Sequence, residues 1–282
     1  MKGLRAAKSY IVTGGGGTKL YVEEGGNPDG QPLVFIHGFN QSRYVWAKQF
    51  QSELLQDFRL IAFDNRGHGW SEKPVEAYQE SEWWAKDLDA VLTELQVKKP
   101  ILIGWSYGGL VVFDYLRFIG EKAIGGVNLV GARSRIGTTE AAAETGKDYH
   151  ALKPKLLANE MTAALEGIAT FLALCSKRRL PPEEYYYFLG FNAMIPPYVR
   201  QALMKRTLSN EDIMTKLSTP FLITHGKEDQ VVLPSHALYN RNQLTHATLS
   251  SYEETGHMPF WEQEQRFNQE LKDFADTIMQ EN

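Results

Sequence analysis

The sequence predicts an α/β fold in which a mostly parallel sheet is covered by helices on both faces and carries an inserted helical segment. Short apolar runs of strand length alternate with amphipathic stretches in the first half of the chain and again near its end. Such alternation is typical of parallel strands buried on both faces. Residues 134–217 interrupt it with an Ala- and Leu-rich helical pattern. With 43% hydrophobic and 23% charged residues, the 282 residues are typical of a globular protein.

Eight segments have the residue types and length of strands. The first two flank a glycine run at residues 14–17, which no Gly-Lys-Ser/Thr follows, so a hairpin turn is expected there and not a phosphate-binding loop. The next five are continuous apolar runs, as expected for strands buried on both faces. The eight expected strands are residues 9–13, 19–23, 32–36, 59–63, 100–104, 126–130, 220–224 and 247–252.

Amphipathic stretches between the strands predict the helices that cover the sheet. They are residues 44–55, 80–95, 110–119 and 267–278. The helical block at residues 134–217 is punctuated by two Pro-Pro pairs, and we expect it to form a lid over the sheet. The predicted organisation is therefore a core of residues 1–133 and 218–282 with residues 134–217 as an inserted cap.

Composition argues against several classes of protein. A net charge of −4 offers no basic surface for a nucleic acid. The single cysteine, Cys175, allows no intrachain disulfide and is expected to be a buried packing residue. No secretory signal and no membrane-spanning stretch are recognisable, so a cytoplasmic protein without a membrane partner is expected. The chain also lacks clustered metal ligands and a dinucleotide fingerprint, so no metal and no cofactor are expected.

The motif Gly-Trp-Ser-Tyr-Gly at residues 104–108 follows a predicted buried strand and precedes a predicted helix. In this context a G-x-S-x-G motif predicts a nucleophile elbow, a strained turn that pushes the serine hydroxyl out above the edge of the sheet. Ser106 is therefore the candidate nucleophile. The Tyr107 N–H would lie at a helix N-terminus, where it can donate a hydrogen bond to a developing oxyanion.

A serine hydroxyl needs a base that removes its proton. With this type of elbow the chain order is serine, acid, histidine, which favours His257, on a loop before the final predicted helix. Asp229 follows the preceding strand and is the candidate acid that fixes the histidine tautomer. Glu228 and Asp114 compete for this role, but Glu228 has the wrong phase in the turn. Asp114 lies about two turns along the helix after the elbow and is therefore expected to lie well away from the catalytic surface.

The second oxyanion donor is expected in the loop after residues 32–36, at the backbone N–H of Phe39. His37 precedes Ser106 in the chain, and we expect it to brace that loop through hydrogen bonds. The polar segment at residues 64–71 is interpreted as a hydrogen-bonded structural loop. Three other late histidines are expected to be surface or structural residues: His225, His236 and His246.

Five ordered motifs resemble the α/β-hydrolase superfamily over nearly the whole chain, in particular its esterase and non-haem haloperoxidase-like branch. They are His-Gly-Phe at 37–39, D-x-R-G-x-G-x-S at 64–71, the elbow at 104–108, Gly-x-x-Asp at 226–229 and Gly-His at 256–257. The resemblance implies an eight-stranded sheet and a triad of Ser106, Asp229 and His257. It also implies an oxyanion hole formed by the amides of Phe39 and Tyr107. Haloalkane dehalogenases and epoxide hydrolases carry aspartate in place of this serine.

The predicted activity is hydrolysis of a carboxylic ester of a small, largely apolar substrate through an acyl-serine intermediate. Trp105 beside the nucleophile and the aromatic residues of the inserted segment predict an apolar substrate pocket. The same triad also serves C–C bond hydrolases and lactonases, which are the second hypothesis, and a very slow ligand receptor is the third. Asn40 replaces the proline that many haloperoxidase-like relatives carry, a departure that argues against perhydrolysis.

Overall fold

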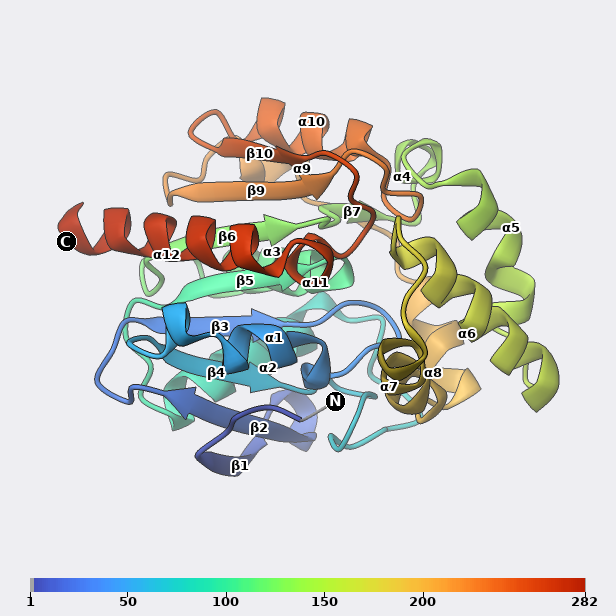
Figure 1. Ribbon diagram of the computed structural model, residues 1–282. Coiled ribbons are helices and arrows are strands. Elements are labelled where there is room, and N and C mark those ends of the chain that lie inside the picture. Colours follow the sequence, from blue (N-terminus) through green and yellow to red (C-terminus); the bar gives the residue numbers. More distant parts are fainter. Residues whose placement is uncertain (1–2, 282) are drawn as a thin grey trace.

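The computed structural model describes residues 3–281 and contains an eight-stranded, mostly parallel sheet between two layers of helices, which confirms the predicted fold class (Figure 1). The strand order is β1-β2-β4-β3-β5-β6-β9-β10. Strand β2 runs antiparallel to β1 and β4, and the other neighbours are parallel. The strands are β1 (Lys8–Thr13), β2 (Lys19–Gly26), β3 (Pro32–Ile36), β4 (Arg59–Phe63), β5 (Ile101–Trp105), β6 (Gly126–Val130), β9 (Phe221–Gly226) and β10 (Thr248–Tyr252).

Helices cover both faces of this sheet. Figure 1 shows α1 (Ala47–Gln51) and α12 (Glu264–Glu281) on the near face, with α2 (Ser81–Glu94) and α3 (Tyr107–Phe118) behind. The stretch expected as one helix at residues 44–55 is broken, because Ser52 has an extended backbone with φ −73° and ψ 123°. The remaining helices of the core are α10 (Pro234–Gln243) and α11 (Pro259–Glu262).

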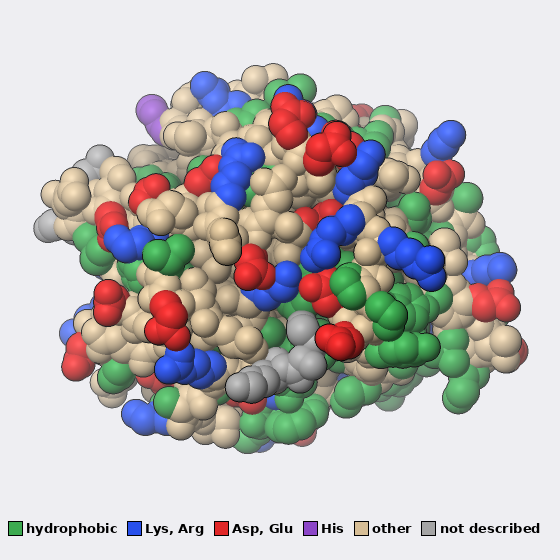
Figure 2. All heavy atoms as spheres, in the orientation of Figure 1, with side chains coloured by type: hydrophobic (Ala, Val, Ile, Leu, Met, Phe, Trp, Pro, Cys, Tyr) green, Lys and Arg blue, Asp and Glu red, His purple; other side chains and the backbone are tan. Residues whose placement is uncertain are grey.

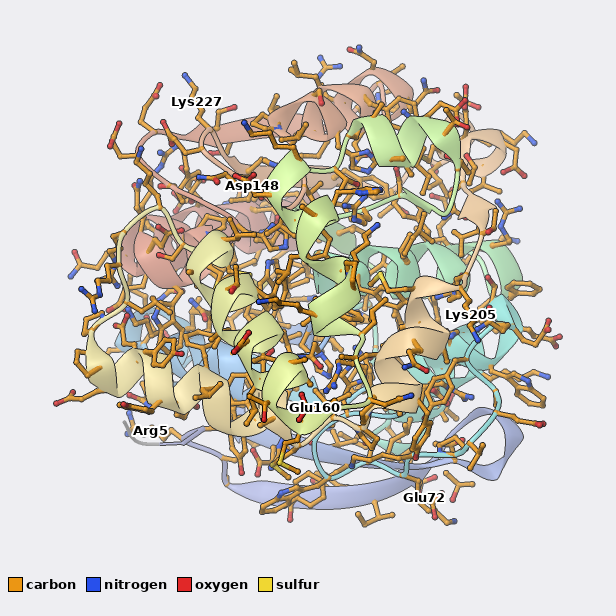
Figure 3. The ribbon with its side chains drawn as sticks, turned by 90° about the vertical axis from the view of Figure 1, so that its right-hand side faces the viewer. Arg5, Glu72, Asp148, Glu160, Lys205 and Lys227 are labelled. Atoms are coloured by element: carbon orange, nitrogen blue, oxygen red, sulfur yellow. The ribbon has the colours of Figure 1, made fainter. Side chains whose placement is uncertain are left out.

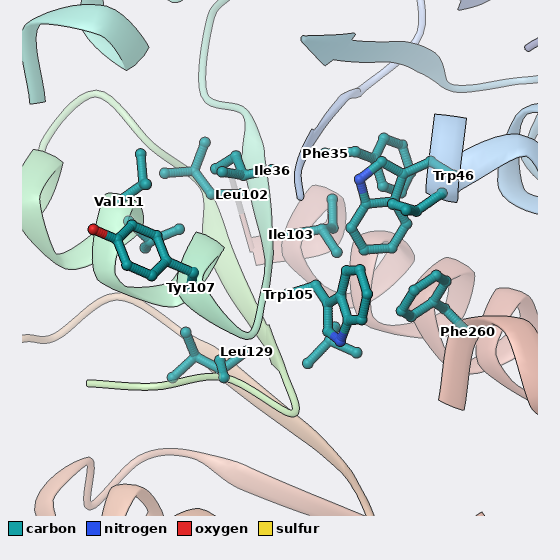
Figure 4. Packing of buried hydrophobic residues seen from close by; sticks show 14 of the residues in the cluster. Phe35, Ile36, Trp46, Leu102, Ile103, Trp105, Tyr107, Val111, Leu129 and Phe260 are labelled. Atoms are coloured by element: carbon teal, nitrogen blue, oxygen red, sulfur yellow. The ribbon is translucent and has the colours of Figure 1, made fainter. Parts of the chain in front are cut away.

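Aromatic packing against β5 ties the last part of the chain to the sheet. Figure 4 shows the rings of Trp46, Trp105 and Phe260 in contact, and each is at most 1% exposed. The Phe260 ring centroid lies 4.5 Å from that of Trp46 and 5.0 Å from that of Trp105. Because Phe260 follows His257 by three residues, this packing fixes the loop that carries the histidine.

Residues 134–217, here called the cap, lie beyond the carboxyl ends of the parallel strands (Figure 1). Figure 3 looks onto the cap and shows α5 and α6 side by side and antiparallel, with Asp148 and Glu160 near their respective starts. The helices of the cap are α4 (Thr139–Ala143), α5 (Lys147–Leu156), α6 (Met161–Cys175), α7 (Pro182–Ala193), α8 (Pro197–Met204) and α9 (Glu211–Met214).

The cap differs from the all-helical expectation at its two ends. There β7 (Arg135–Ile136) pairs with β8 (Leu208–Ser209) in a short antiparallel ladder that holds the entry and exit of the segment together.

The surface of the cap is partly apolar. Figure 2 shows hydrophobic side chains gathered over the region of α6 and α7, and one residue of α7, Tyr186, is 68% exposed. Within residues 3–281, no helix combines the length and apolarity needed to span a membrane.

A buried ion pair between an arginine and an aspartate joins the cap to the core. The Arg206 guanidinium contacts the Asp114 carboxylate at 2.7 Å and donates a hydrogen bond to the Tyr107 hydroxyl at 3.3 Å. Both charged side chains are at most 1% exposed. Removing one member of such a pair leaves an unpaired buried charge, so this contact anchors the cap beside the elbow.

Candidate active site

Ser106 occupies a sharp turn between β5 and α3. Its φ of 55° and ψ of −114° lie in a region that is strained for a residue with a side chain. A Cβ atom on Gly104 would lie 2.9 Å from the Gly108 carbonyl oxygen. One on Gly108 would lie 2.3 Å from the Ile36 carbonyl oxygen. The two glycines of the motif are therefore required by close backbone approach, and they allow the elbow expected from the sequence.

The structure brings Asp229 and His257 together from the ends of two neighbouring parallel strands, β9 and β10. The Nδ1 atom of His257 lies 2.7 Å from Oδ2 of Asp229, and both side chains are at most 1% exposed. The Nε2 atom of His257 is also buried and has no hydrogen-bond partner among residues 3–281. The histidine thus has one nitrogen oriented by a carboxylate and one available nitrogen.

The Asp229 carboxylate is surrounded by hydrogen-bond donors. Its Oδ1 atom accepts hydrogen bonds from the backbone N–H groups of Val231 and Val232 at 2.8 and 3.0 Å. Burial alone would raise the pKa of Asp229, but His257 and His225 outweigh that effect and hold this pKa well below its usual range. An ionised carboxylate accepts the Nδ1–H of His257 and so selects the tautomer whose Nε2 atom carries no proton.

Two neighbours of this pair have no recognisable motif in the sequence. His225 is buried, donates from Nε2 to the Val232 carbonyl oxygen at 2.8 Å, and lies 3.2 Å from Oδ2 of Asp229. Gly131 has φ 48°, and a Cβ atom there would lie 3.1 Å from Nδ1 of His257. The sequence offers one indication of their role, which is that both residues lie at the carboxyl ends of buried strands.

The competing carboxylates have other partners. Glu228 accepts a hydrogen bond from the Thr255 N–H at 2.9 Å. Asp114 is paired with Arg206, and burial raises the pKa of Asp114 to about 6. Neither carboxylate makes a hydrogen bond to His257 within the described chain. No group of three or more His, Cys, Asp or Glu side chains in residues 3–281 is placed to hold a metal ion.

Phe39 and Tyr107 line the same cavity as Ser106. The loop that carries Phe39 lies directly against the elbow, because a Cβ atom on Gly38 would be 3.0 Å from the Cβ atom of Ser106. Tyr107 is the first residue of α3, so its N–H has no acceptor within the helix. Both loops expected to supply an oxyanion hole therefore meet beside the serine.

The loop beside Phe39 is held from the core and from the cap. His37 accepts a hydrogen bond from the Asn65 N–H at 3.0 Å, and burial lowers the pKa of His37 to about 3, so the ring stays neutral at neutral pH. Asn40 donates a hydrogen bond to Asn192 of α7 at 2.8 Å and has φ 58°. Proline cannot adopt this angle, so it would not fit the backbone at position 40.

A cavity of about 160 Å³ lies over Ser106, between the core and the cap. Its lining from the core, here called the core wall, consists of Phe39, Ser106, Tyr107, Arg133 and Val231. Its lining from the cap, here called the cap wall, consists of Ile136, Gly137, Thr138, Ala141, Ala142, Thr145, Tyr149, Lys153, Phe171 and Met204. A cavity of similar volume in another protein accommodates benzene, so a small ring or a short chain fits here.

Trp105, expected to line the substrate pocket, lies elsewhere and is not part of either wall. It is 1% exposed, and its Nε1–H donates a hydrogen bond to the His257 carbonyl oxygen at 2.8 Å. Alternate side chains of a strand point to opposite faces of the sheet, so a neighbour of the nucleophile need not share its cavity. Trp105 therefore packs against the loop that carries His257 and does not line the cavity.

The cap also contacts the histidine loop directly. The His257 N–H donates a hydrogen bond to the carbonyl oxygen of Cys175 at 2.9 Å. Glu262 accepts hydrogen bonds from the backbone N–H groups of Gly256 and Lys177 at 2.9 and 2.8 Å. Cys175 is fully buried, which confirms the expected packing role, and burial raises the pKa of its thiol. The position of the histidine thus depends on the end of α6.

Comparisons with known proteins agree with this architecture. The family described as alpha/beta hydrolase fold matches residues 31–264. An esterase from Rhodococcus sp. ECU1013 is 33% identical, with a TM-score of 0.90 over 96% of this chain and 99% of that one. An esterase from Exiguobacterium antarcticum is 25% identical, with a TM-score of 0.86 over 95% of this chain and 100% of that one.

A non-haem chloroperoxidase of Streptomyces lividans is 27% identical over 267 residues, which cover 87% of this chain and 92% of that protein. Like the two esterases, it is similar over nearly the full length of the chain. The chain therefore belongs to the α/β-hydrolase superfamily, in the branch of esterases and non-haem haloperoxidases, and is a hydrolase.

Proposed function

We propose that this hydrolase cleaves a small carboxylic ester through an acyl-serine intermediate, with Ser106 as nucleophile, His257 as base and Asp229 as orienting acid. The observation that carries this proposal is the buried 2.7 Å contact between Asp229 and His257 at the sheet edge that also bears the strained serine. An aspartate in this position stabilises the imidazolium that forms when the histidine takes the serine proton.

The proposed reaction has two halves. The Ser106 oxygen attacks the ester carbonyl while Nε2 of His257 takes the hydroxyl proton, and the backbone amides of Phe39 and Tyr107 donate to the resulting oxyanion. The C–O bond to the alcohol then breaks as His257 returns the proton to the leaving oxygen. Water repeats the same steps on the acyl-serine, which releases the carboxylic acid and restores the serine.

The cap is proposed to govern which ester enters. Ten residues of the cavity lining come from residues 134–217, and they include the apolar side chains of Ile136 and Phe171. The volume of about 160 Å³ favours a short or compact acyl or alcohol group. Relatives described as esterases support ester cleavage as the proposed reaction.

A serine-directed phosphonate tests the proposal. It should label Ser106 stoichiometrically and block hydrolysis of a panel of short, medium-length and aryl esters. Turnover of a vinylogous diketone or a lactone in preference to every ester would favour the alternative reactions. Labelling at another serine, with Ser106→Ala still active, would contradict the mechanism itself.

A further inference from the structure

Arg133 is a buried cation beside the elbow that the proposed reaction does not use. Its backbone N–H donates a hydrogen bond to the Ser106 carbonyl oxygen at 3.0 Å, so the nucleophile and this arginine are fixed relative to each other. The residue is 8% exposed and lines the cavity over Ser106. A guanidinium is rarely buried to this extent without a carboxylate partner.

The hydrogen bonds of Arg133 leave most of its donors available. Its Nη2 atom donates to the Thr145 hydroxyl at 2.9 Å and to the Val231 carbonyl oxygen at 3.3 Å, both neutral acceptors. The Nε and Nη1 atoms make no hydrogen bond to any residue in 3–281, and no carboxylate among these residues lies within 4.0 Å of the guanidinium. Burial lowers the pKa of Arg133, yet arginine remains charged in proteins.

The acidic side chains whose charges act on Arg133 already have cationic or basic partners. Asp229 is in contact with His257 and His225. Glu144 forms an ion pair with Arg135 and lies 2.6 Å from Nδ1 of His236. Neither carboxylate is therefore free to neutralise the guanidinium at close range.

The cap wall adds two further donors to the same cavity. Tyr149 and Lys153 lie four residues apart on α5, and therefore on one face of that helix. Burial raises the pKa of Tyr149 to about 12, so its hydroxyl keeps its proton, and this hydroxyl has no hydrogen-bond partner within the described chain. Lys153 is half-buried and forms no ion pair with any described carboxylate, and its ammonium lies 5.9 Å from the centroid of the Tyr149 ring.

We infer that the cavity binds an ester that carries a carboxylate, which Arg133, Lys153 and Tyr149 hold while Ser106 attacks the ester carbonyl. This inference rests on the proposed esterase function and specifies its substrate class. The arginine and the lysine are donors only, the phenol hydroxyl can donate as well, and an ionised carboxylate is an acceptor only. A substrate anion would thus provide the charge partner that the fold does not supply.

Two matched substrate pairs test the inference. The first pair is monomethyl glutarate, whose anion lies on the acyl side of the ester, and the methyl ester of glutaric acid monoamide, which has a neutral amide in place of that anion. The second pair is 4-acetoxybutanoate, whose anion lies on the alcohol side of the ester, and the corresponding neutral amide. We expect the parent enzyme to prefer the anionic member of one pair by about 10- to 100-fold in kcat/KM, as for other charge-assisted hydrogen bonds.

Variants assign this preference to residues. Arg133→Gln should lose most of the preference for the anionic substrate. Lys153→Met, which changes a half-buried side chain, should lower this preference roughly 3- to 10-fold. Lys155→Met is the matched control, because Lys155 lies on the same helix and pairs with Glu166, and both of these side chains are more than half exposed. It should keep the parental preference. If Arg133→Gln does not fold, Lys153→Met and Lys155→Met carry the comparison.

A binding measurement separates this inference from the proposed function. In the Ser106→Ala protein, which cannot turn over an ester, monomethyl glutarate or 4-acetoxybutanoate should raise Tm, and the matching amide should not. Adding Lys153→Met to this protein should reduce the rise in Tm. If esters are hydrolysed without preference for an anion in either pair, the inference fails and the proposed function stands. If no ester is hydrolysed but an anion binds in this way, the anion site stands and the proposed function fails. If neither occurs, both are wrong.

Discussion

The core wall and the cap wall of the cavity are built on different principles. In the core wall, Ser106 and its neighbours lie on short turns at strand ends, and their backbone positions are set by β3, β5 and β6. The cap wall comes from short helices whose entry and exit are joined by the two-residue strands β7 and β8. The proposed chemistry lies on the wall built from strand ends, and most of the side chains that would contact a substrate lie on the wall built from short helices.

Removing the nucleophile should have the largest effect. Ser106→Ala is expected to lower kcat for any accepted ester by a factor on the order of 10⁶, because no other group can form the acyl intermediate. Steady-state rates on an activated ester would measure this loss of kcat, and circular dichroism would confirm that the variant folds. Ser176→Ala is the matched control, since Ser176 is also 7% exposed but lies on the cap. A comparable loss in both variants would contradict the assignment of chemistry to the core wall.

Neutralising the orienting carboxylate comes next. Asp229→Asn should fold and lose about 10⁴ in turnover at neutral pH, because an amide in this position favours the wrong histidine tautomer. Glu228→Gln should stay within about tenfold of the parent, since Glu228 bonds to the Thr255 N–H and not to His257. Turnover of one activated ester ranks the two variants. If Glu228→Gln is the more impaired variant, the acid is assigned to the wrong residue.

A change in the cap wall should alter selectivity and leave the chemistry in place. Phe171 of α6 lines the cavity, and its ring contacts those of Phe39 and Tyr149. Phe171→Ala enlarges the cavity and should shift kcat/KM towards longer or bulkier esters by roughly 10- to 100-fold relative to acetate esters. Rates on a series of acyl chain lengths would show the shift. A uniform loss on every substrate would mean that the cap wall acts on the chemistry.

The smallest predicted effect concerns pH and stability on the core side. His68 is buried next to His37, and burial, followed by the charge of His37, lowers its pKa from 6.5 to about 3. The unfolded chain therefore takes up a proton near pH 6.5 and the folded chain does not, so stability falls as pH falls from 6.5 towards 3.

His68→Asn removes this site and should flatten the pH dependence. Between pH 7.5 and 5.5 the parent should lose about 1.4 kcal/mol more unfolding free energy than the variant, since each pKa unit is worth about that amount. Urea unfolding of both proteins at the two pH values measures the difference. Equal losses in parent and variant would show that His68 is not held neutral in the folded state.

Much of the core side could be predicted from local sequence. Gly104 and Gly108 mark the elbow because only glycine permits the backbone approach at those positions. Residues 44–55 illustrate where local pattern fails, because the amphipathic period continues across Ser52 although the backbone does not remain helical. Apolar periodicity reports which side chains are buried, and it does not report where a helix ends.

The sequence by itself determined the strand–helix alternation, the elbow at Ser106 and the chain order that favours Asp229 and His257, because these depend on local backbone geometry and strand order. Only the tertiary structure decided that His225 contacts the same carboxylate, that Trp105 supports the histidine loop, and that Arg133 lines the cavity. The Trp105 contact and the lining of the cavity join segments far apart in the chain, whereas His225 and Asp229 meet within the short turn at the end of β9. The contacts of His225 and Trp105 depend on how the loops at the strand ends pack together, and the cavity depends on how the cap packs on the sheet. No local pattern of residues encodes that packing.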